Sequence, residues 1–215
     1  MSGDAGAAVD WVHVDAACIV VNKPSGLLSV PGRGAHLQDC VATRVQGCYA
    51  DALVVHRLDM ATSGLLLFAR GAPAQRRLSD GFAKREVHKR YAAVVHGVVP
   101  QDDGEINLPL LTDWPNRPRQ KVDAVQGKPS LTRYTVQARD AQHNTTRVAL
   151  APVTGRSHQL RVHLQALGHP ILGDALYAPP DVQALATRLL LHADRLGFVH
   201  PVSGAWLQFE SPAAF

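Results

Sequence analysis

Cysteine is scarce in this chain of 215 residues, and the cysteines that occur form no recognisable pattern. Cys18, Cys40 and Cys48 are odd in number and include no C-x-x-C pair. This excludes a disulfide framework and gives no indication of a zinc site. We therefore expect a protein of the reducing cytoplasm that holds no metal.

Long apolar runs and a targeting segment are also absent. No stretch approaches the ~18 consecutive apolar residues of a membrane helix, so we expect a soluble chain without membrane contact. Residues 1–10 have neither the basic start nor the apolar run of a secretory signal, and we predict a flexible N-terminus there. The apolar, charged, glycine and proline contents are near globular averages, which excludes a disordered or fibrous protein.

The sequence lacks the motifs of three enzyme classes that handle nucleotides. A zinc-dependent base deaminase needs H-x-E and P-C-x-x-C, and neither occurs. A possible G-x-G-x-x-G loop begins at Gly32, but Leu37 stands where its third glycine belongs. A possible P-loop at Lys128 continues with Pro129 where a serine or threonine belongs. The sequence therefore does not indicate any of these three classes, and none of these motifs predicts a cofactor.

Basic residues gather in clusters, whereas acidic residues are scattered. The formal net charge of +4 at pH 7 permits a polyanionic partner without requiring one. A single basic cluster is typical of a solvated face, but several of them around the candidate motifs indicate a surface that follows phosphates. The clusters are Arg76 and Arg77, Lys84 and Arg85, and residues 88–90, 117–121 and 156–161.

Apolar periodicity predicts an α+β fold with an antiparallel-rich sheet and few helices. Residues 72–85 and 158–167 have helical patterns, and Gly168 supplies a left-handed C-cap to the second helix. We expect a single domain over residues 11–215. Strands are predicted at residues 17–21, 52–58, 64–69, 89–97, 104–111, 130–138 and 146–151.

The most informative stretch spans residues 56–67, with the sequence HRLDMATSGLLL. Asp59 lies in the connection between the strands predicted at residues 52–58 and 64–69, and His56 and Arg57 stand just before it, at the end of the first strand. A solvated surface turn is the alternative explanation, since any turn can carry an isolated HRLD. The whole stretch resembles the central motif of the RluA family of pseudouridine synthases, in which the aspartate of HRLD is the catalytic residue.

Further blocks resemble the same family, in matching order and spacing. They are residues 21–28, 89–97, 155–163 and 168–174. The resemblance implies the pseudouridine synthase fold, a mixed and mostly antiparallel sheet with flanking helices and a central active-site cleft. Residues 113–122 are similar to members of the family without an N-terminal S4 RNA-binding domain, and we expect no such domain.

Conversion of uridine to pseudouridine breaks the bond between ribose C1′ and base N1 and joins C1′ to C5. It needs a carboxylate, a group that keeps this carboxylate ionised, and a base for the C5 proton. The resemblance implies Asp59 as the carboxylate, either as nucleophile at C1′ or as base for the 2′ proton. It implies Arg161 as the ion-pair partner of Asp59, on the helix face opposite Leu160 and Leu164. It implies Tyr91 as the residue that stacks on the base and reaches its C5 proton, although an isolated tyrosine in a strand is typical of a core.

The resemblance also implies how RNA is bound. A uridine inside folded RNA must be flipped out, at a cost of a few kcal/mol, and Arg57 matches the arginine that takes its place. Leu191 matches a residue of the pocket wall. The other residues that we expect to contact RNA are His56, Arg85, Lys89, Arg117, Arg119, Lys121, Arg156 and His158.

Within the family, the sequence is most similar to members with dual specificity. Their targets, uridine 32 in the tRNA anticodon loop and uridine 746 in a 23S rRNA hairpin loop, are implied as partners of this chain, which we expect to be a monomer. Alternatives are a family member with another rRNA or tRNA target and a non-catalytic RNA-binding or chaperone module on the same fold. The combination of Asp59, Tyr91 and Arg161 argues against the module, since binding alone needs none of them.

Overall fold

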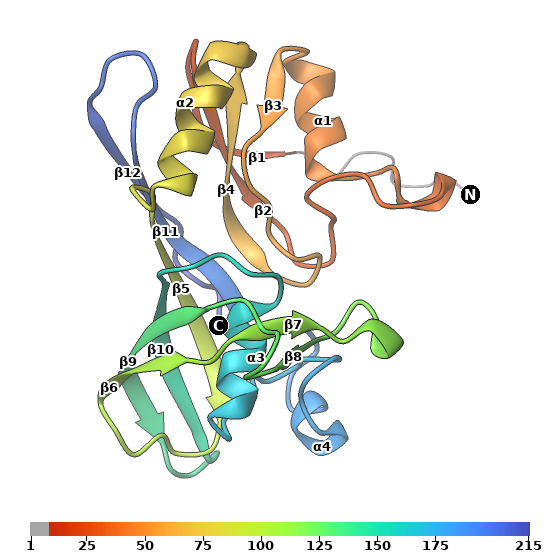
Figure 1. Ribbon diagram of the computed structural model, residues 1–215, viewed down its shortest axis with the longest axis vertical. Helices are drawn as coiled ribbons and strands as arrows, with labels where there is room; N and C mark the ends of the chain where they lie inside the picture. Colours follow the sequence, from red (N-terminus) through yellow and green to blue (C-terminus); the bar gives the residue numbers. More distant parts are fainter. Residues whose placement is uncertain (1–8) are drawn as a thin grey trace. The chain divides into compact units, whose positions relative to one another are not determined.

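The computed structural model describes residues 9–215, and the chain divides into two compact units (Figure 1). Unit 1 holds the chain up to His88 together with Ala193–Pro212, and unit 2 holds Lys89–His192 together with Ala213–Phe215. Residues 1–8, most of the predicted flexible N-terminus, lie outside the described residues. The predicted single domain over residues 11–215 stays a prediction.

The predicted apolar runs supply the central strands of unit 1. The strands are β1 (Asp10–Val14), β2 (Cys18–Lys23), β3 (Ala52–Val54), β4 (Ser63–Arg70), β11 (Leu191–Val199) and β12 (Trp206–Glu210). β2 pairs with β1 and with β4, and β3 pairs with β4, in each case antiparallel. β11 belongs to unit 1 from Ala193 onward and pairs antiparallel with β12.

The core of unit 1 lies between these strands and a helix. The helical elements are η1 (Ala35–Leu37), α1 (Val41–Cys48) and α2 (Gly71–Ala83). Successive side chains of a strand point to opposite faces, so Val20 of β2 and Leu67 of β4 share one face of the sheet. Both are fully buried and belong to one apolar cluster with Leu78 of α2. Burial of each such side chain stabilises the unit by about 1.5–3 kcal/mol.

Unit 2 contains four strands of the ten-stranded sheet and a separate two-stranded hairpin. The strands are β5 (His88–His96), β6 (Asp103–Asn107), β7 (Leu110–Thr112), β8 (Gln120–Val122), β9 (Leu131–Asp140) and β10 (Thr145–Pro152). The four sheet strands have the order β5-β10-β9-β6, whereas β7 and β8 pair with each other. The helical elements are η2 (Trp114–Asn116), α3 (Gln159–Ala166) and α4 (Pro180–Gln183).

The second predicted helix is present as α3, and its end is formed as predicted. Gly168 has a φ of 87°, the left-handed conformation that a residue without Cβ adopts at low cost. The predicted division of α3 into a leucine face and an open face is wrong. Residues 159–164 are all buried, including Arg161, because α3 contacts β8, β9 and β10 in unit 2.

Two predicted strands are shorter than the apolar patterns suggested. The strand predicted at residues 52–58 ends at Val54, and the backbone of Leu58 is bonded to the Ser29 side chain and not to a neighbouring strand. The run at residues 104–111 is divided into β6 and β7. Pro109 lies between them and has no N–H to donate to a sheet.

The α+β class and the mostly antiparallel sheet are confirmed. The predicted central active-site cleft stays a prediction. Over residues 9–215, no helix combines the length and the apolar character needed to span a membrane.

We predict that Gly64→Ala destabilises the protein strongly, whereas Gly204→Ala has a small effect. Gly64 has a φ of 113°, and an added Cβ would lie 2.3 Å from the carbonyl oxygen of Ala193. Gly204 also has a positive φ, 73°, but an added Cβ there meets no atom within 4 Å. The two substitutions share backbone strain and differ in the space available.

Urea denaturation measures both effects. Gly204→Ala should lower the free energy of unfolding by about 1–2 kcal/mol, the cost of a left-handed residue with a Cβ. Gly64→Ala should lower it by more than about 4 kcal/mol, since backbone has to move. Equal losses in the two variants would mean that the close approach to Ala193 does not constrain the start of β4.

Candidate active site

Asp59 lies in the connection between β3 and β4, as predicted, and the backbone before it is fixed. Ser29 forms both bonds: its hydroxyl donates to the carbonyl of Leu58 over 2.7 Å, and the N–H of Leu58 donates to the same oxygen over 3.0 Å. Ser29 is 3% exposed and Leu58 is buried, so water does not compete for these bonds.

The backbone after Asp59 is held by the same stretch of chain. The N–H of Gly26 donates to the carbonyl of Met60 over 2.9 Å, and the Ser25 hydroxyl donates to the carbonyl of Ala61 over 2.7 Å. The carbonyl of Asp59 itself accepts from the N–H of Thr62 at 3.1 Å. The turn that follows β2 therefore fixes the chain on both sides of the half-buried Asp59 side chain.

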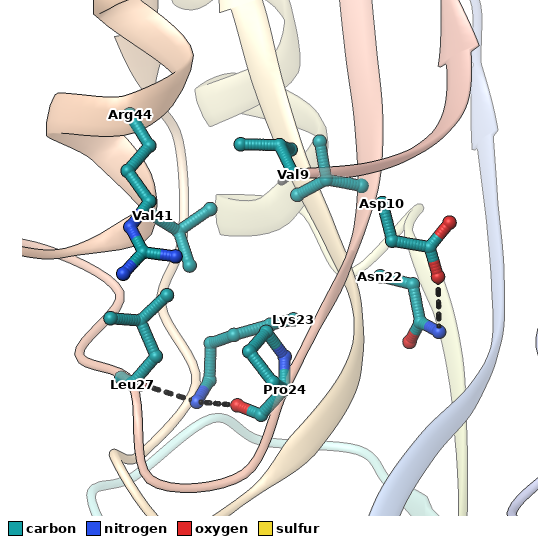
Figure 2. Close-up of a pocket in the computed structure, with 9 residues that line it drawn as sticks. Val9, Asp10, Asn22, Lys23, Pro24, Leu27, Val41 and Arg44 are labelled. Atoms are coloured by element: carbon teal, nitrogen blue, oxygen red, sulfur yellow. Dashed lines mark hydrogen bonds between the residues drawn. The ribbon is translucent and has the colours of Figure 1, made fainter. Parts of the chain in front are cut away.

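Lys23, at the end of β2, ties these two segments together. Its Nζ donates to the carbonyls of Pro24 at 2.9 Å and Leu27 at 2.5 Å (Figure 2). It also donates to the carbonyl of Met60 at 2.9 Å, so that all three of its protons are used. The side chain is 1% exposed. Burial lowers the pKa of Lys23 to about 8, and the negative charge of Asp59 opposes that shift. At neutral pH a buried ammonium group thus lies within electrostatic range of Asp59.

No role for Lys23 was predicted from the sequence, although it stands in the block at residues 21–28. The signal was present in Asn22-Lys23-Pro24-Ser25-Gly26, which is typical of a turn. A lysine in a turn is normally solvated. Its burial depends on the carbonyl of Met60, 37 residues further along the chain.

Beside Lys23, unit 1 contains a small pocket (Figure 2). Asn22 donates to Asp10 at its edge over 2.9 Å, and Arg44 is bonded to Asp39. Asp59 is not among the lining residues, so we do not assign the uridine to this pocket. The lining residues are Val9, Asp10, Val21, Asn22, Lys23, Pro24, Leu27, Val41 and Arg44.

His56 and Arg57 have different surroundings despite being neighbours. His56 Nε2 accepts from the N–H of Leu67 at 3.0 Å, and its ring stacks on Phe82 of α2 with 4.7 Å between ring centroids. This contact joins the HRLD segment to β4 and α2. Arg57 is exposed, and no group within residues 9–215 forms a hydrogen bond or an ion pair with its guanidinium. Arg57 is therefore available to a partner.

Arg161, on α3 in unit 2, is held by Asp174 in a bidentate ion pair. Arg161 Nε and Nη2 donate to the two carboxylate oxygens over 2.8 and 2.6 Å. The side chains are 5% and 1% exposed, respectively. Asp174 also accepts from the N–H groups of Leu176 and Tyr177 at 2.9 and 3.1 Å. The carboxylate is thereby saturated, and the plane of the Arg161 guanidinium is set by it.

Tyr177 brings several of the predicted site residues of unit 2 together. Its ring lies 5.0 Å from the Arg161 guanidinium carbon and 5.5 Å from that of Arg119. Its hydroxyl lies 2.6 Å from His158 Nδ1 and accepts from the N–H of Gln120 at 2.8 Å. Tyr177 was not predicted, since it lies outside the recognised blocks.

The block at residues 155–163 also contains buried residues that hold the scaffold. Gln159 accepts from the Thr154 hydroxyl at 2.7 Å and donates to the carbonyl of Leu131 at 3.0 Å. His163 is fully buried, and its Nε2 lies 3.0 Å from the carbonyl of Leu108, which can only accept. Burial lowers the pKa of His163. A neutral imidazole bonded at both nitrogens therefore ties α3 to the sheet of unit 2.

Tyr91, Lys89 and Leu191 also lie in unit 2. Tyr91 is half-buried on β5, opposite Leu150 of β10. Burial lowers the pKa of Lys89, two residues earlier on the same strand. Leu191 is 3% exposed. The catalytic role of Tyr91, the RNA contact of Lys89 and the place of Leu191 in the pocket wall stay predictions.

The remaining predicted RNA contacts are largely exposed. Arg117 stacks on Trp114, with its guanidinium carbon 4.0 Å from the ring centroid, and Trp114 is 67% exposed. Lys121 and Arg156 are exposed in unit 2, and Arg85 is exposed just after α2 in unit 1. Exposed cations and an exposed aromatic ring are groups that phosphates and bases contact.

Among the described residues, the side chains close enough to hold a metal ion are His13, Asp15 and Cys18. None of them is a predicted catalytic or RNA-binding residue. The predicted catalytic and RNA-binding residues are therefore separate from this cluster.

Comparison with known proteins identifies the family. Residues 17–166 match the model of the RNA pseudouridylate synthase family. The chain is 55% identical over 207 residues to the dual-specificity RNA pseudouridine synthase RluA of Pasteurella multocida, covering 96% of this chain and 94% of the relative. It is 53% identical over 204 residues to the RluA enzyme of Escherichia coli, covering 95% and 93%. The solved structure of human RNA pseudouridylate synthase domain containing 1 aligns with a TM-score of 0.80 at 27% identity, covering 99% of this chain and 86% of that one.

These similarities extend over both units and include every block that the sequence analysis singled out. The match to the family model alone covers more than half of the chain. This chain belongs to the RluA family of RNA pseudouridine synthases and is an enzyme that isomerises uridine in RNA to pseudouridine.

Proposed function

We propose that this pseudouridine synthase modifies one uridine in the anticodon loop of tRNA and one in a hairpin loop of 23S rRNA. The observation that carries the proposal is the similarity, over more than nine-tenths of both chains, to bacterial enzymes named dual-specificity synthases. One active site that serves two RNAs has to recognise what they share. In single-stranded loops this is shape and accessible bases more than a long sequence.

Asp59 supplies the carboxylate of the reaction. The C1′–N1 bond breaks, the base turns, C1′ joins C5, and the proton of C5 is replaced by one on N1. Asp59 acts on C1′ as a nucleophile or on the 2′ proton as a base. Either step needs the carboxylate in one place, and the bonds that Ser29 and Gly26 make to the residues beside Asp59 support this role.

Tyr91 and Arg161 supply the remaining groups. Tyr91 stacks on the detached base and takes part in transfer of the C5 proton. Arg161 is the catalytic cation of the proposal, since a cation favours the ionised form of a carboxylate. The saturated pair with Asp174 supports this role, because it fixes the guanidinium plane before RNA binds.

Arg57 takes the place of the flipped uridine in the RNA. Its exposure, together with the absence of any partner within residues 9–215, supports this role. A guanidinium plane can stack between bases, which offsets part of the few kcal/mol that flipping costs. Phosphate contacts come from the basic residues His56, Arg85, Lys89, Arg117, Arg119, Lys121, Arg156 and His158.

The enzyme acts as a monomer in the cytoplasm and needs no cofactor for chemistry. The isomerisation is intramolecular, so neither electrons nor a group has to come from outside. Free cysteines at positions 18, 40 and 48 suit a reducing compartment.

The proposal predicts that the purified enzyme releases tritium from C5 of the target uridine in both a tRNA anticodon stem-loop and the 23S rRNA hairpin. Asp59→Asn should release none from either RNA while binding both within a few-fold of the original affinity. The reason is that the carboxylate acts on bond-making and contributes little to phosphate contacts. Asp80→Asn, an exposed aspartate on α2, is the matched control and should keep full activity.

Two results would contradict the assignments separately. Release from neither RNA, with activity on another uridine loop, would overturn the targets but not the chemistry. Substantial turnover by Asp59→Asn would overturn the role of Asp59 but not the targets.

Arg57 should be needed for flipping and not for chemistry. Arg57→Ala is expected to lose activity on a folded stem-loop by a few kcal/mol more than on a substrate whose target base is already unstacked. Arg57→Lys should recover little, since an ammonium group has no planar surface to stack. Single-turnover rates on the matched pair of substrates measure the difference.

Arg76→Ala removes an exposed arginine of α2 and should affect the two substrates equally. Equal losses for Arg57→Ala on the two substrates would assign Arg57 to an electrostatic role instead.

Asp174 should be needed for the stability of unit 2. Asp174→Asn leaves the buried Arg161 without its carboxylate and should lower the free energy of unfolding by about 3–5 kcal/mol. Asp181→Asn, an exposed aspartate on α4, should change it by about 0.5 kcal/mol or less. Urea denaturation of both variants measures this. A small loss for Asp174→Asn would show that Arg161 finds another carboxylate or water.

A further inference from the structure

A cluster of metal-ligating side chains lies at the turn between β1 and β2, and the isomerisation uses none of them. His13 Nε2 lies 2.8 Å from Asp15 Oδ2, and Cys18 Sγ lies 3.7 Å from the same oxygen. All three ligating atoms are within 4.8 Å of one another. Around a tetrahedral zinc ion with bonds of about 2.0–2.3 Å, ligand atoms lie roughly 3.3–3.8 Å apart. Small side-chain movements would bring the three atoms to those separations.

The Asp15 carboxylate is fixed so that one oxygen is left for this cluster. Its Oδ1 accepts from the N–H groups of Ala17 at 2.7 Å and Cys18 at 2.8 Å. With Oδ1 occupied by these two bonds, Asp15 Oδ2 is directed at His13 and Cys18 and is the oxygen that can bind an ion.

His200, which follows β11, orients the carboxylate from another side. Its Nδ1 accepts from the N–H groups of Val202 at 3.3 Å and Ser203 at 2.9 Å, so the ring proton is on Nε2. That Nε2 lies 3.2 Å from Asp15 Oδ2 and donates to it. A protonated nitrogen cannot bind a metal, so His200 is a supporting partner of the ligand and not a ligand itself. Such partners are typical of metal sites.

Burial and packing restrict the ligands to this arrangement. Cys18 is fully buried, and the side chains of His13 and Asp15 are 28% and 32% exposed. The His13 ring lies on Phe209 of β12, with 5.1 Å between ring centroids. The cluster thus has a closed side, at Cys18, and a side that solvent can reach.

We propose that His13 Nε2, Asp15 Oδ2 and Cys18 Sγ bind one Zn²⁺ ion, with water at the fourth position. Imidazole, carboxylate and thiolate are the ligands that zinc takes in proteins. On binding, the Cys18 thiol releases its proton to solvent, and the His13 ring proton moves to Nδ1. A neutral imidazole and two anions then balance the charge of the ion.

The zinc site is structural and separate from the chemistry. Cys18 begins β2 and Lys23 ends it, so the cluster and the Asp59 segment lie near opposite ends of one strand, about 16 Å apart at 3.3 Å per residue. Through Asp15 and His200, the ion would link the β1–β2 turn to the chain that follows β11. It adds a cross-link to unit 1 that the isomerisation does not require.

The test uses the full-length enzyme without an affinity tag and zinc chloride alone as the probe. Competition with a chromophoric chelator should give one bound ion per chain, and zinc should raise the melting temperature, because it binds the folded state. Cobalt in place of zinc should give a thiolate-to-metal charge-transfer band. His13→Ala and Cys18→Ser should each lower the affinity by at least 100-fold, and His200→Ala by about 10–100-fold.

Matched controls separate the cluster from other side chains of the same kind. Cys48→Ser removes an exposed thiol, and His143→Ala removes a histidine paired with Asp140 at 2.7 Å but with no neighbouring cysteine. Both should bind zinc as the original chain does. If Cys18→Ser does not fold, the His13→Ala affinity and the cobalt band decide. No binding of one ion, or binding that His13→Ala leaves unchanged, would overturn the proposal.

Discussion

The position of Asp59 depends on one buried ammonium group. Lys23 Nζ donates to three carbonyls, and one of them belongs to the residue after Asp59. Without that group, the carbonyls of Pro24 and Leu27 would lose the donor that Lys23 supplies, at about 1–3 kcal/mol for each one that water cannot reach, while the carbonyl of Met60 would keep the N–H of Gly26. The turn after β2 and the segment around Asp59 therefore form one structure. The three hydrogen bonds give a reason for a lysine at this position, although burial opposes its charge and lowers its pKa to about 8.

Unit 2 also contains a buried ion that fixed hydrogen-bond partners satisfy, and there the ion is the carboxylate of Asp174. Asp174 takes four hydrogen bonds, two from Arg161 and two from backbone N–H groups. Tyr177 then joins α3 to β8 through the N–H of Gln120. In both units, directional hydrogen bonds from fixed partners hold a buried ion in one orientation. An apolar side chain in the same place could adopt several orientations. The backbone beside Asp59 and the side chain of Arg161 are held by these two ions.

Much of the fold was predictable because the pattern of apolar and polar residues, and the positions of glycine and proline, are local signals of secondary structure. β4 and β10 follow apolar patterns, and α3 ends where Gly168 allows it. α1 was not predicted, since its N-cap is Cys40, a thiol that accepts from Thr43, and it contains valines and a glycine. Of the site, the HRLD block was recognisable. The partners of Lys23 and Arg161 were not, because they are set by contacts between distant parts of the chain.

The hydrogen bonds around Asp59 determine at which stage the backbone of this segment loses its conformational entropy. Ser25, Gly26 and Ser29 hold the backbone on both sides of Asp59 in the free protein. The entropy loss of orienting that segment is therefore incurred during folding and not at the encounter with RNA. Because this backbone is already ordered in the free protein, no part of the free energy of RNA binding is lost to ordering it.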